Sequence, residues 1–372
     1  MRIISVVTLI SPLGEYGGPT RVALNQAAAL RARGHDVVVA AATRGFDEVP
    51  TSISDVPVKL FPARQALPGA GFAGLSSPGL WRWVRREARS VDVLHVHGAR
   101  DLVTLPAARL AHLARVPYFL QSHGMIDPSS HPLARPVDAV LTRPVLRAAE
   151  AVFHLTALER DQLTEVSRGA ARLLPLHNGV PAAEAGPPAT DDVEVLYLAR
   201  LAPRKRPLSF VEAAVALHAE HPGVRFSLVG PDEGEGAKVA RAIELAQRQG
   251  VQIQWEGALS PGQTLDRLRH ATVYVLPSVD EPYPMSVLEA MSVARPVVIT
   301  DTCGLSGVVT EAGAGHVTDS TTGSLVSAIG QLLKDPDESA AMGRRGRAFV
   351  REQMSMDSIA ETLEGHYASA IA

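Results

Sequence analysis

The 372-residue sequence contains a single cysteine, Cys303. One cysteine excludes an intrachain disulfide and a cluster of thiolate metal ligands, so we expect a reducing, cytoplasmic setting. Long hydrophobic runs are also missing, because no stretch approaches the ~18 consecutive apolar residues of a transmembrane helix. The apolar N-terminal segment MRIISVVTLISPLG is β-branched and lacks a small-residue cleavage site, which favours a buried strand over a signal peptide.

Net charge is small, at −3, but it is unevenly distributed. Residues 1–180 carry 20 Lys and Arg against 14 Asp and Glu (+6), which leaves 16 against 25 (−9) for residues 181–372. A basic N-terminal half is compatible with peripheral contact with an anionic membrane or with an anionic acceptor. Arginines scattered over a solvated surface would give the same count.

Short runs rich in Val, Ile and Leu alternate with longer amphipathic stretches along the chain. Examples are IISVVTLI, DVVVAA, DVLHVH and PYFLQSH in the first half, and VEVLYLA, RFSLVG, VQIQWEG, TVYVLPS and RPVVIT in the second. This alternation is typical of βα units around a parallel sheet. Between the two sets, PAAEAGPPATDD has no core periodicity and indicates a linker.

We therefore predict an α/β protein with two Rossmann-like, doubly wound domains. Their bounds are residues 1–180 and 193–372, with a linker at 181–192 and a last helix that can cross back to the N-terminal domain. Ligands of such sheets bind beyond the carboxyl ends of the strands. We expect the chemistry in a cleft between the two domains.

Glycines follow the first predicted strand in the segment SPLGEYGGPT. Gly14, Gly17 and Gly18 would let the backbone approach a ligand closely, just before a helix that begins near Pro19. The segment is not G-x-G-x-x-G, so a dinucleotide fingerprint is absent. A tight turn without a ligand remains the alternative.

Four cations, Arg200, Arg204, Lys205 and Arg206, follow the strand VEVLYLA within seven residues. Arginine presents a bidentate fork and lysine a point charge, a combination that suits a diphosphate. A solvated basic loop is the alternative.

The segment LPSVDEPYPMSVLEAM runs from the end of a predicted strand into a helix. Pro282 and Pro284 exclude Glu281 from that helix and leave Glu289 one to two turns inside it, where a carboxylate can accept two ribose hydroxyls. The N-terminus of the helix is a ready anion site. The amides expected to point out of it are those of Met285, Ser286 and Val287. Ser286-x-x-Glu289 also spells a capping box, in which Glu289 returns to the start of its own helix.

Three further features have competing interpretations. His123, in LQSHGMID, closes a strand at the expected cleft edge, whereas a strand-end histidine beside glycine is more typical of structural hydrogen bonding. Asp335 and Asp337 resemble a metal-binding pair, but between two surface helices an aspartate is an ordinary N-cap. The helix LWRWVRREAR fits a membrane surface or, preferably, a core-facing helix with an arginine outer face.

In order along the chain, GGPT, HGM, NGV, LARLAPRKR and EPYPMSVLEAM resemble the signature motifs of the retaining GT-B glycosyltransferases of family four, the glycosyltransferase group 1 type. The resemblance runs from about Met1 to Ala294 and loosely to the end. It implies a GT-B fold that transfers a hexose or N-acetylhexosamine with retention from a UDP- or GDP-sugar. The acceptor would be a hydroxyl of a glycan, lipid-linked or small-molecule compound. No metal or other cofactor is expected, and no nucleic acid.

The resemblance also implies roles for individual residues. His123 would contact the transferred sugar, Arg200 and Lys205 the diphosphate, and Glu281 the donor sugar. The remaining donor contacts would come from Gly17 and Gly18, the backbone from Gln254 to Gly257 around the base, the amides of Met285, Ser286 and Val287 at the phosphate, and Glu289 at the ribose. Pro284, Ala199 and Arg206 stand where the family commonly has glycine.

Two other classes of function remain as alternatives. A nucleotide-sugar epimerase or a catalytically silent binding module could use the same two domains. A hydrolase fits poorly, because it needs two acids flanking the scissile bond and no diphosphate clamp.

Overall fold

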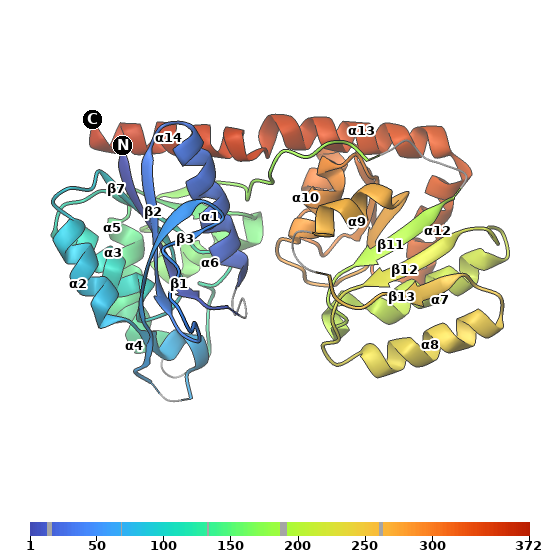
Figure 1. Ribbon diagram of the computed structural model, residues 1–372, viewed down its shortest axis with the longest axis horizontal. Helices are drawn as coiled ribbons and strands as arrows, with labels where there is room; N and C mark the ends of the chain where they lie inside the picture. The colour runs from blue at the N-terminus through green and yellow to red at the C-terminus, as the bar shows by residue number, and fades with distance from the viewer. Residues whose placement is uncertain (13–16, 68, 132–133, 187–191, 260–262) are drawn as a thin grey trace. The chain divides into compact units, whose positions relative to one another are not determined.

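The computed structural model describes residues 1–12, 17–67, 69–131, 134–186, 192–259 and 263–372. The chain forms two compact units, and Figure 1 labels many of their helices and strands. Unit 1 comprises Met1–Gly179 and Met356–Ala372, and unit 2 comprises Val180–Ser355. Unit 1 therefore includes the C-terminal helix. Gly14 and residues 187–191 of the predicted linker lie outside the described residues.

Unit 1 contains a sheet with the strand order β10-β9-β8-β7-β1-β2-β4-β3, in which only the β3–β4 pair is antiparallel among the described strands. These strands are β1 (Arg2–Ile10), β2 (Asp36–Thr43), β3 (Ser52–Ile53), β4 (Val56–Pro62), β7 (Val93–His97), β8 (Tyr118–Gln121), β9 (Ala151–His154) and β10 (Leu173–Pro175). A separate antiparallel pair consists of β5 (Arg64–Gln65) and β6 (Leu75–Ser76).

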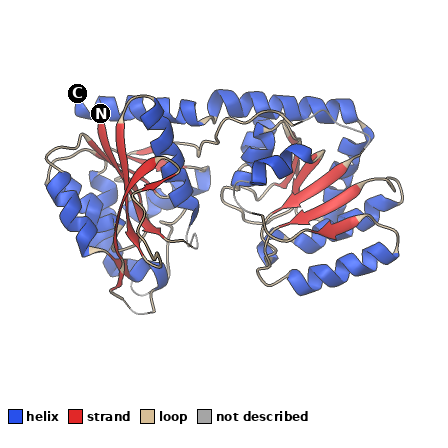
Figure 2. Cartoon of the chain, in the orientation of Figure 1, coloured by secondary structure: helices blue, strands red, loops and turns tan. Residues whose placement is uncertain are grey.

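The helices of unit 1 lie on both faces of the sheet (Figure 2). They are α1 (Gly17–Ala32), α2 (Pro78–Glu87), α3 (Thr104–Leu113), α4 (Ala134–Val137), α5 (Arg143–Ala148), α6 (Ala157–Ser167) and α14 (Met356–Ile371), with a 3-10 turn η1 (Gly71–Gly74) and a π-helical turn η2 (Asp138–Thr142).

Strand β1 shows why the N-terminal apolar run is a strand and how the two faces of the sheet are filled. Apart from Arg2, every residue of β1 is buried, as expected for a parallel strand covered on both sides. Ile4 and Val6 join the core under α2 and α3, while Ile3 and Val7 join the core under α1 and α14. This alternation follows from the two-residue period of a strand.

Helix α2 faces the core, which confirms the preferred interpretation of LWRWVRREAR. Leu80 and Val84 are at most 2% exposed and Trp83 is 9% exposed, and all three belong to the core of unit 1. The Trp81 indole donates to the Val103 carbonyl oxygen at 3.3 Å. The apolar side of α2 is therefore covered by its own unit, and the arginines of the segment lie on the exposed side.

Unit 2 contains a sheet with the strand order β13-β12-β11-β14-β15-β16, and all described pairings in it are parallel. The strands are β11 (Glu194–Leu198), β12 (Arg225–Val229), β13 (Ile253–Trp255), β14 (Val273–Leu276), β15 (Val297–Thr300) and β16 (Gly315–Thr318). The helices are α7 (Pro207–His218), α8 (Gly236–Arg248), α9 (Thr264–His270), α10 (Met285–Ser292), α11 (Ser306–Ala312), α12 (Thr322–Lys334) and α13 (Pro336–Gln353), with a 3-10 turn η3 (Pro203–Lys205).

The strand order of unit 2 reverses between β11 and β14. From β11 the chain moves outward through β12 to β13, then returns to the other side of β11 at β14 and continues to β16. Such a reversal leaves a crevice at the carboxyl ends of the two central strands, which is where ligands bind in open α/β sheets. Together, the two parallel-sheet α/β units confirm the predicted fold class. Among the described residues no helix is long and apolar enough to cross a membrane.

Candidate active site

The loops that follow β11 and β14 lie side by side at the switch point of unit 2. The first holds the cations from Arg200 to Arg206, and the second holds Glu281. A backbone hydrogen bond joins them, from the Val279 amide to the Arg204 carbonyl oxygen at 3.0 Å. The loop after β15 supports Glu281 from the other side, because the Gly304 amide donates to its carbonyl oxygen at 2.8 Å. The fold therefore brings together two predicted motifs that are far apart in sequence.

Lys205 and Glu281 form a buried ion pair between these loops. The Lys205 Nζ lies 2.6 Å from Glu281 Oε2, and their side chains are 11% and 9% exposed. Arg204 Nη2 lies 3.5 Å from the same oxygen. Burial lowers the pKa of Lys205, and the attraction of Glu281 opposes that effect. The site thus holds a desolvated cation against one carboxylate, with a second cation beside it.

The other two cations of the loop point elsewhere. Arg200 Nη1 lies 2.6 Å from Glu233 Oε1, and both side chains are about half exposed. Arg206 adopts a φ of 52° at the N-cap of α7, and its Nη1 donates to the Ser320 carbonyl oxygen at 2.5 Å. Left-handed backbone favours glycine. The positive φ of Arg206 therefore explains why the family that the sequence resembles commonly has glycine at this position.

The N-terminus of α10 lies directly beyond the Glu281 loop, with Pro284 at the N-cap. Pro284 makes no side-chain cap, and Ser286 lies inside the helix, where its Oγ accepts from the Tyr274 hydroxyl at 2.7 Å. The capping-box alternative is therefore wrong, because Ser286 does not occupy the N-cap. Glu289 is only 3% exposed. The Val287 amide already donates to the Pro284 carbonyl oxygen at 3.1 Å, whereas we predicted it to face a phosphate.

Cys303 lies close to this site but is not a nucleophile. Its side chain is buried, and burial raises the pKa of the thiol to about 11. A protonated, covered thiol is chemically inert. Among the described residues no group of three or more His, Cys, Asp and Glu side chains is arranged to hold a metal ion. Asp335 accepts from the Glu338 amide at 3.0 Å, so it acts as the N-cap of α13.

The predicted base-binding segment lies at the ends of β12 and β13. The Gly230 amide donates to the Gly257 carbonyl oxygen at 2.7 Å, and the Trp255 indole donates to the Gly230 carbonyl oxygen at 2.9 Å. Gly257 has a φ of 81°, which requires glycine or strains any other residue. The backbone here is therefore fixed by its own hydrogen bonds. The side chain of Gln254 takes no part in these hydrogen bonds and instead donates to Glu256 at 3.2 Å.

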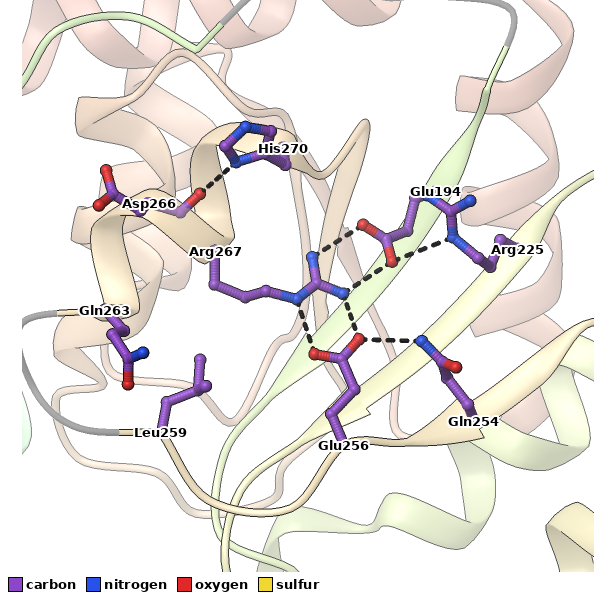
Figure 3. Close-up of a pocket in the computed structure, with 9 residues that line it drawn as sticks. All are labelled: Glu194, Arg225, Gln254, Glu256, Leu259, Gln263, Asp266, Arg267 and His270. Atoms are coloured by element: carbon purple, nitrogen blue, oxygen red, sulfur yellow. Dashed lines mark hydrogen bonds and ion pairs between the residues drawn. The ribbon is translucent and has the colours of Figure 1, made fainter.

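Gln254 lines a pocket of about 630 Å³ on the face of the sheet beside α9 (Figure 3). Arg267 lies at its centre and donates to Glu194 at 2.7 and 2.8 Å and to Glu256 at 2.7 and 2.9 Å. Burial alone would raise the pKa of Glu194, but the hydrogen bonds from Arg267 and Ser227 lower it below the usual value. The guanidinium is saturated by two carboxylates, so it serves the stability of unit 2 rather than anion binding.

In unit 1, His123 closes β8 in a loop that is held by a buried glutamate. Glu159, 3% exposed, accepts from Ser122 Oγ at 2.5 Å and from the Gly124 amide at 2.6 Å, on either side of His123. His123 itself has a φ of 52° and is half-buried. Its Nε2 lies 2.9 Å from Nδ1 of His97, at the end of β7. The rule that a strand-end histidine beside glycine is structural also applies to His97, which precedes Gly98, and the sequence analysis did not single out Glu159.

The glycine-rich segment leads into α1, which begins at Gly17. Thr20 Oγ1 donates to the Leu9 carbonyl oxygen at 3.1 Å and fixes the start of the helix to the end of β1. Gly18 is exposed, and a Cβ placed there would meet nothing within 4 Å. The space beside Gly18 is therefore open on unit 1.

Unit 1 also contains a smaller pocket of about 220 Å³, formed by the connection between β5 and β6, the loop after β7, and the segment that leads from β8 into α4. Most of its lining is apolar: Leu67, Ala70, Ala73, Leu102, Ala134 and Val137. Arg100 reaches its wall but is neutralised by Asp138, to which it donates at 2.7 and 3.2 Å. The pocket therefore suits an uncharged, partly apolar group.

Two doubly wound units, one of which places a buried lysine and a helix N-terminus at its switch point, define a GT-B glycosyltransferase. Family models agree: residues 183–349 match "Glycosyl transferases group 1", and residues 17–179 match "Glycosyl transferase 4-like domain". The chain belongs to the group 1 glycosyltransferases.

Curated relatives and solved structures carry related names. Glycogen synthase of Mycobacterium tuberculosis is 30% identical over 280 residues, which is 72% of this chain and 65% of that protein. D-inositol 3-phosphate glycosyltransferase of Nocardia farcinica is 29% identical over 419 residues, 100% of this chain and 89% of that protein. The structure of Anabaena Alr3699/HepE in complex with UDP has a TM-score of 0.74 at 16% identity and covers 99% of this chain and 100% of its own. Sucrose-phosphate synthase from Thermosynechococcus elongatus has a TM-score of 0.69 at 20% identity, with 99% of each chain covered. At these identities the solved structures establish the fold.

Proposed function

We propose that the protein is a retaining, metal-independent glycosyltransferase that moves a hexose or N-acetylhexosamine from a UDP- or GDP-sugar to a hydroxyl of its acceptor. The observation that carries this proposal is the buried Lys205–Glu281 pair beside the N-terminus of α10, at the carboxyl ends of β11 and β14. A diphosphate binds well where a cation, arginines and a helix N-terminus converge.

The same groups account for catalysis by electrostatics. As the bond between the anomeric carbon of the sugar and the diphosphate of the donor breaks, negative charge grows on the leaving diphosphate. Lys205 is desolvated, so its attraction for that charge is stronger than in water. Arg200 lies on the exposed side of the same loop and would exchange Glu233 for a phosphate oxygen when the donor binds. These cations do the neutralising that a metal ion does in other transferases.

Glu281 and Glu289 would then position the donor sugar and the ribose. Glu289 is buried one turn inside α10, which suits a carboxylate that accepts two hydroxyls from a nucleotide at the helix N-terminus. Glu281 is held by Lys205 through one oxygen, and its other oxygen is the one we assign to a sugar hydroxyl. We propose that the departing phosphate takes the proton from the attacking hydroxyl, so that the reaction needs no protein nucleophile.

The names of relatives and neighbours support a nucleotide-sugar donor. Anabaena Alr3699/HepE has been crystallised with UDP and with UDP and glucose. The relatives named above are a glycogen synthase and a D-inositol 3-phosphate glycosyltransferase. Glucose on UDP is therefore the first donor to test.

We place the acceptor on unit 1. The apolar pocket beside Arg100 is open to a partly apolar portion of an acceptor, such as a lipid-linked or aromatic group. Filling it by Ala73→Trp is expected to raise the KM for such an acceptor and to leave donor binding unchanged.

Nucleotide release measured with each UDP- and GDP-sugar, with and without acceptors and with and without EDTA, tests the proposal. Release that depends on an acceptor and is unaffected by EDTA supports a transferase, and NMR of the product gives its anomeric configuration. Interconversion of the donor sugar without an acceptor would identify an epimerase instead. Binding of a nucleotide without any turnover would identify a silent binding module.

A further inference from the structure

Three buried or half-buried histidines form a continuous row in unit 1. His95 and His97 come from β7, and His123 follows β8. The rings of His95 and His97 are stacked, with centroids 4.5 Å apart and planes 3° apart. Tyr367 of α14 is hydrogen-bonded to Nδ1 of His95 at the buried end of the row. The row therefore leads from the core of unit 1 to the residue that we assign to the transferred sugar.

The contact between His97 and His123 is an edge-to-edge hydrogen bond. Nδ1 of His97 lies 2.9 Å from Nε2 of His123, while the ring centroids are 5.1 Å apart and the planes differ by 12°. Nearly parallel rings with a short nitrogen–nitrogen distance and well-separated centroids lie beside one another in roughly one plane. That arrangement gives an N–H···N bond close to the ideal geometry.

Both imidazole rings are uncharged near pH 7, and this limits which ring nitrogens can carry a proton. Burial lowers the pKa of His123 to about 3, and burial also lowers the pKa of His97 well below the usual value. A neutral imidazole carries one N–H, so one ring donates in the shared bond and the other accepts. The nitrogen that carries the proton on His97 therefore determines which nitrogen carries it on His123.

The backbone around His123 is fixed independently of its side chain. Glu159 holds Ser122 and Gly124 on both sides of it, and Leu155 donates to the second oxygen of Glu159 at 2.6 Å. With the backbone fixed, His97 is the described group that is hydrogen-bonded to the ring of His123 and sets its plane.

We propose that His97 is a positioning residue that locks His123 in one tautomer and one ring plane. His123 then presents a single defined role through Nδ1, either donor or acceptor, to a hydroxyl of the transferred sugar. This inference rests on the proposed function for the role of His123, but the lock itself is a property of unit 1. A side chain that touches substrate through a hydrogen bond gains from being held in its productive state before binding.

Nitrogen NMR on the intact protein labelled with 15N-histidine tests the lock without any turnover. We expect His123 to show the shifts of one tautomer and a scalar coupling to His97 across the hydrogen bond. In His97→Phe, which keeps a ring in the stack with His95 but removes the nitrogens, the coupling disappears and His123 shows shifts averaged over two tautomers. Averaged shifts already in the unmodified protein would overturn the proposal.

Kinetics test the consequence for transfer. His97→Phe is expected to lower kcat about 10-fold or more with less than about a 3-fold change in the KM for the donor, because a mispositioned contact acts on the chemical step. His97→Asn places an amide near the position of Nδ1 and is expected to recover most of that loss. In a His123→Phe background, His97→Phe should cause no further loss, because residues that act through one another are not additive.

The outcomes separate the two claims. Independent losses from His97 and His123, or no recovery in His97→Asn, would show that His97 does not act through His123. A locked tautomer in a protein that transfers no sugar would contradict the proposed function and leave the lock intact.

Discussion

Lys205 Nζ lies 2.6 Å from Glu281 Oε2, and the two residues are 76 positions apart in the sequence. Their side chains are about nine-tenths buried, so water solvates the two charges only weakly. Burying an ion pair of this kind costs desolvation energy that an apolar contact of similar size would not cost. Its position at the switch point of unit 2 indicates that the cost serves ligand binding.

Replacing Lys205 tests that role most directly among single substitutions. Lys205→Ala is expected to lower transfer about 100-fold or more, the scale of removing one group that stabilises transition-state charge. The protein should stay folded, because Arg204 remains near Glu281 and limits the ~3–5 kcal/mol penalty of an uncompensated buried charge. Nucleotide release and thermal melts measure the two effects. Full transfer in Lys205→Ala would refute the site.

Arg206→Gly is the matched control for Lys205→Ala. It removes a cation from the same loop, but one that donates to Ser320 and has a φ of 52°. Glycine adopts that backbone without strain, so we expect a change of less than ~1 kcal/mol in the free energy of unfolding and nearly unchanged transfer. A large loss of transfer would show that positive charge anywhere in the loop is what matters.

Glu289→Gln is expected to weaken donor binding about 10-fold or more while leaving the fold intact. The substitution preserves shape and removes the negative charge that strengthens hydrogen bonds from ribose hydroxyls by ~1.5–3 kcal/mol. Titration calorimetry with the nucleotide measures it. Glu194→Gln serves as the control, because Glu194 is equally buried but lies at the amino end of β11. Equal losses in both variants would point to general destabilisation.

Glu233→Gln is expected to tighten nucleotide binding. Arg200 is engaged by Glu233 in the absence of donor, and the donor has to displace that contact. Because both side chains are about half exposed, the pair is worth at most ~1 kcal/mol, so the gain should not exceed about 5-fold. Weaker binding in Glu233→Gln would mean that Glu233 supports the site instead of competing for Arg200.

The Arg267 network predicts how unit 2 responds to acid. Hydrogen bonds from Arg267 lower the pKa of Glu256, and they lower that of Glu194 against the effect of burial. The folded protein therefore binds fewer protons than the unfolded chain in the acid range, and its free energy of unfolding falls as the pH drops below about 4.5. Arg267→Met should lower stability at neutral pH and flatten this acid dependence. Melting temperatures from pH 7 to pH 3 measure both, and an unchanged slope in Arg267→Met would contradict the assignment.

The sequence predicted the elements whose pattern is local and missed those that depend on distant partners. β1 was predictable because a parallel strand buried on both faces reads as an apolar run. β4, which pairs with β2, was not predicted, since Pro57, Lys59 and Pro62 interrupt its apolar pattern. The start of α7 at Pro207 also follows a local signal, because proline is favoured in the first turn of a helix.

The candidate site shows the same division. The motifs around Lys205 and Glu281 were recognisable, but their contact depends on the neighbouring positions of β11 and β14 in the sheet. The capping box around Ser286 was a plausible local pattern, and Pro284 at the N-cap overrode it. The role of Glu159 could not be found from the sequence, because its hydrogen bonds to Ser122 and Gly124 join α6 to the loop after β8, which is more than 30 residues earlier in the chain.

A thermal-shift measurement with UDP, GDP and ADP, each with and without EDTA, tests the central claim most directly. A ligand that binds only the folded state raises the melting temperature, and the stabilisation grows with the logarithm of the ratio of ligand concentration to Kd. We predict stabilisation by UDP or GDP that EDTA does not change and that Lys205→Ala abolishes. No shift with any of the three nucleotides, or a shift that EDTA removes, would contradict a metal-independent donor site on unit 2.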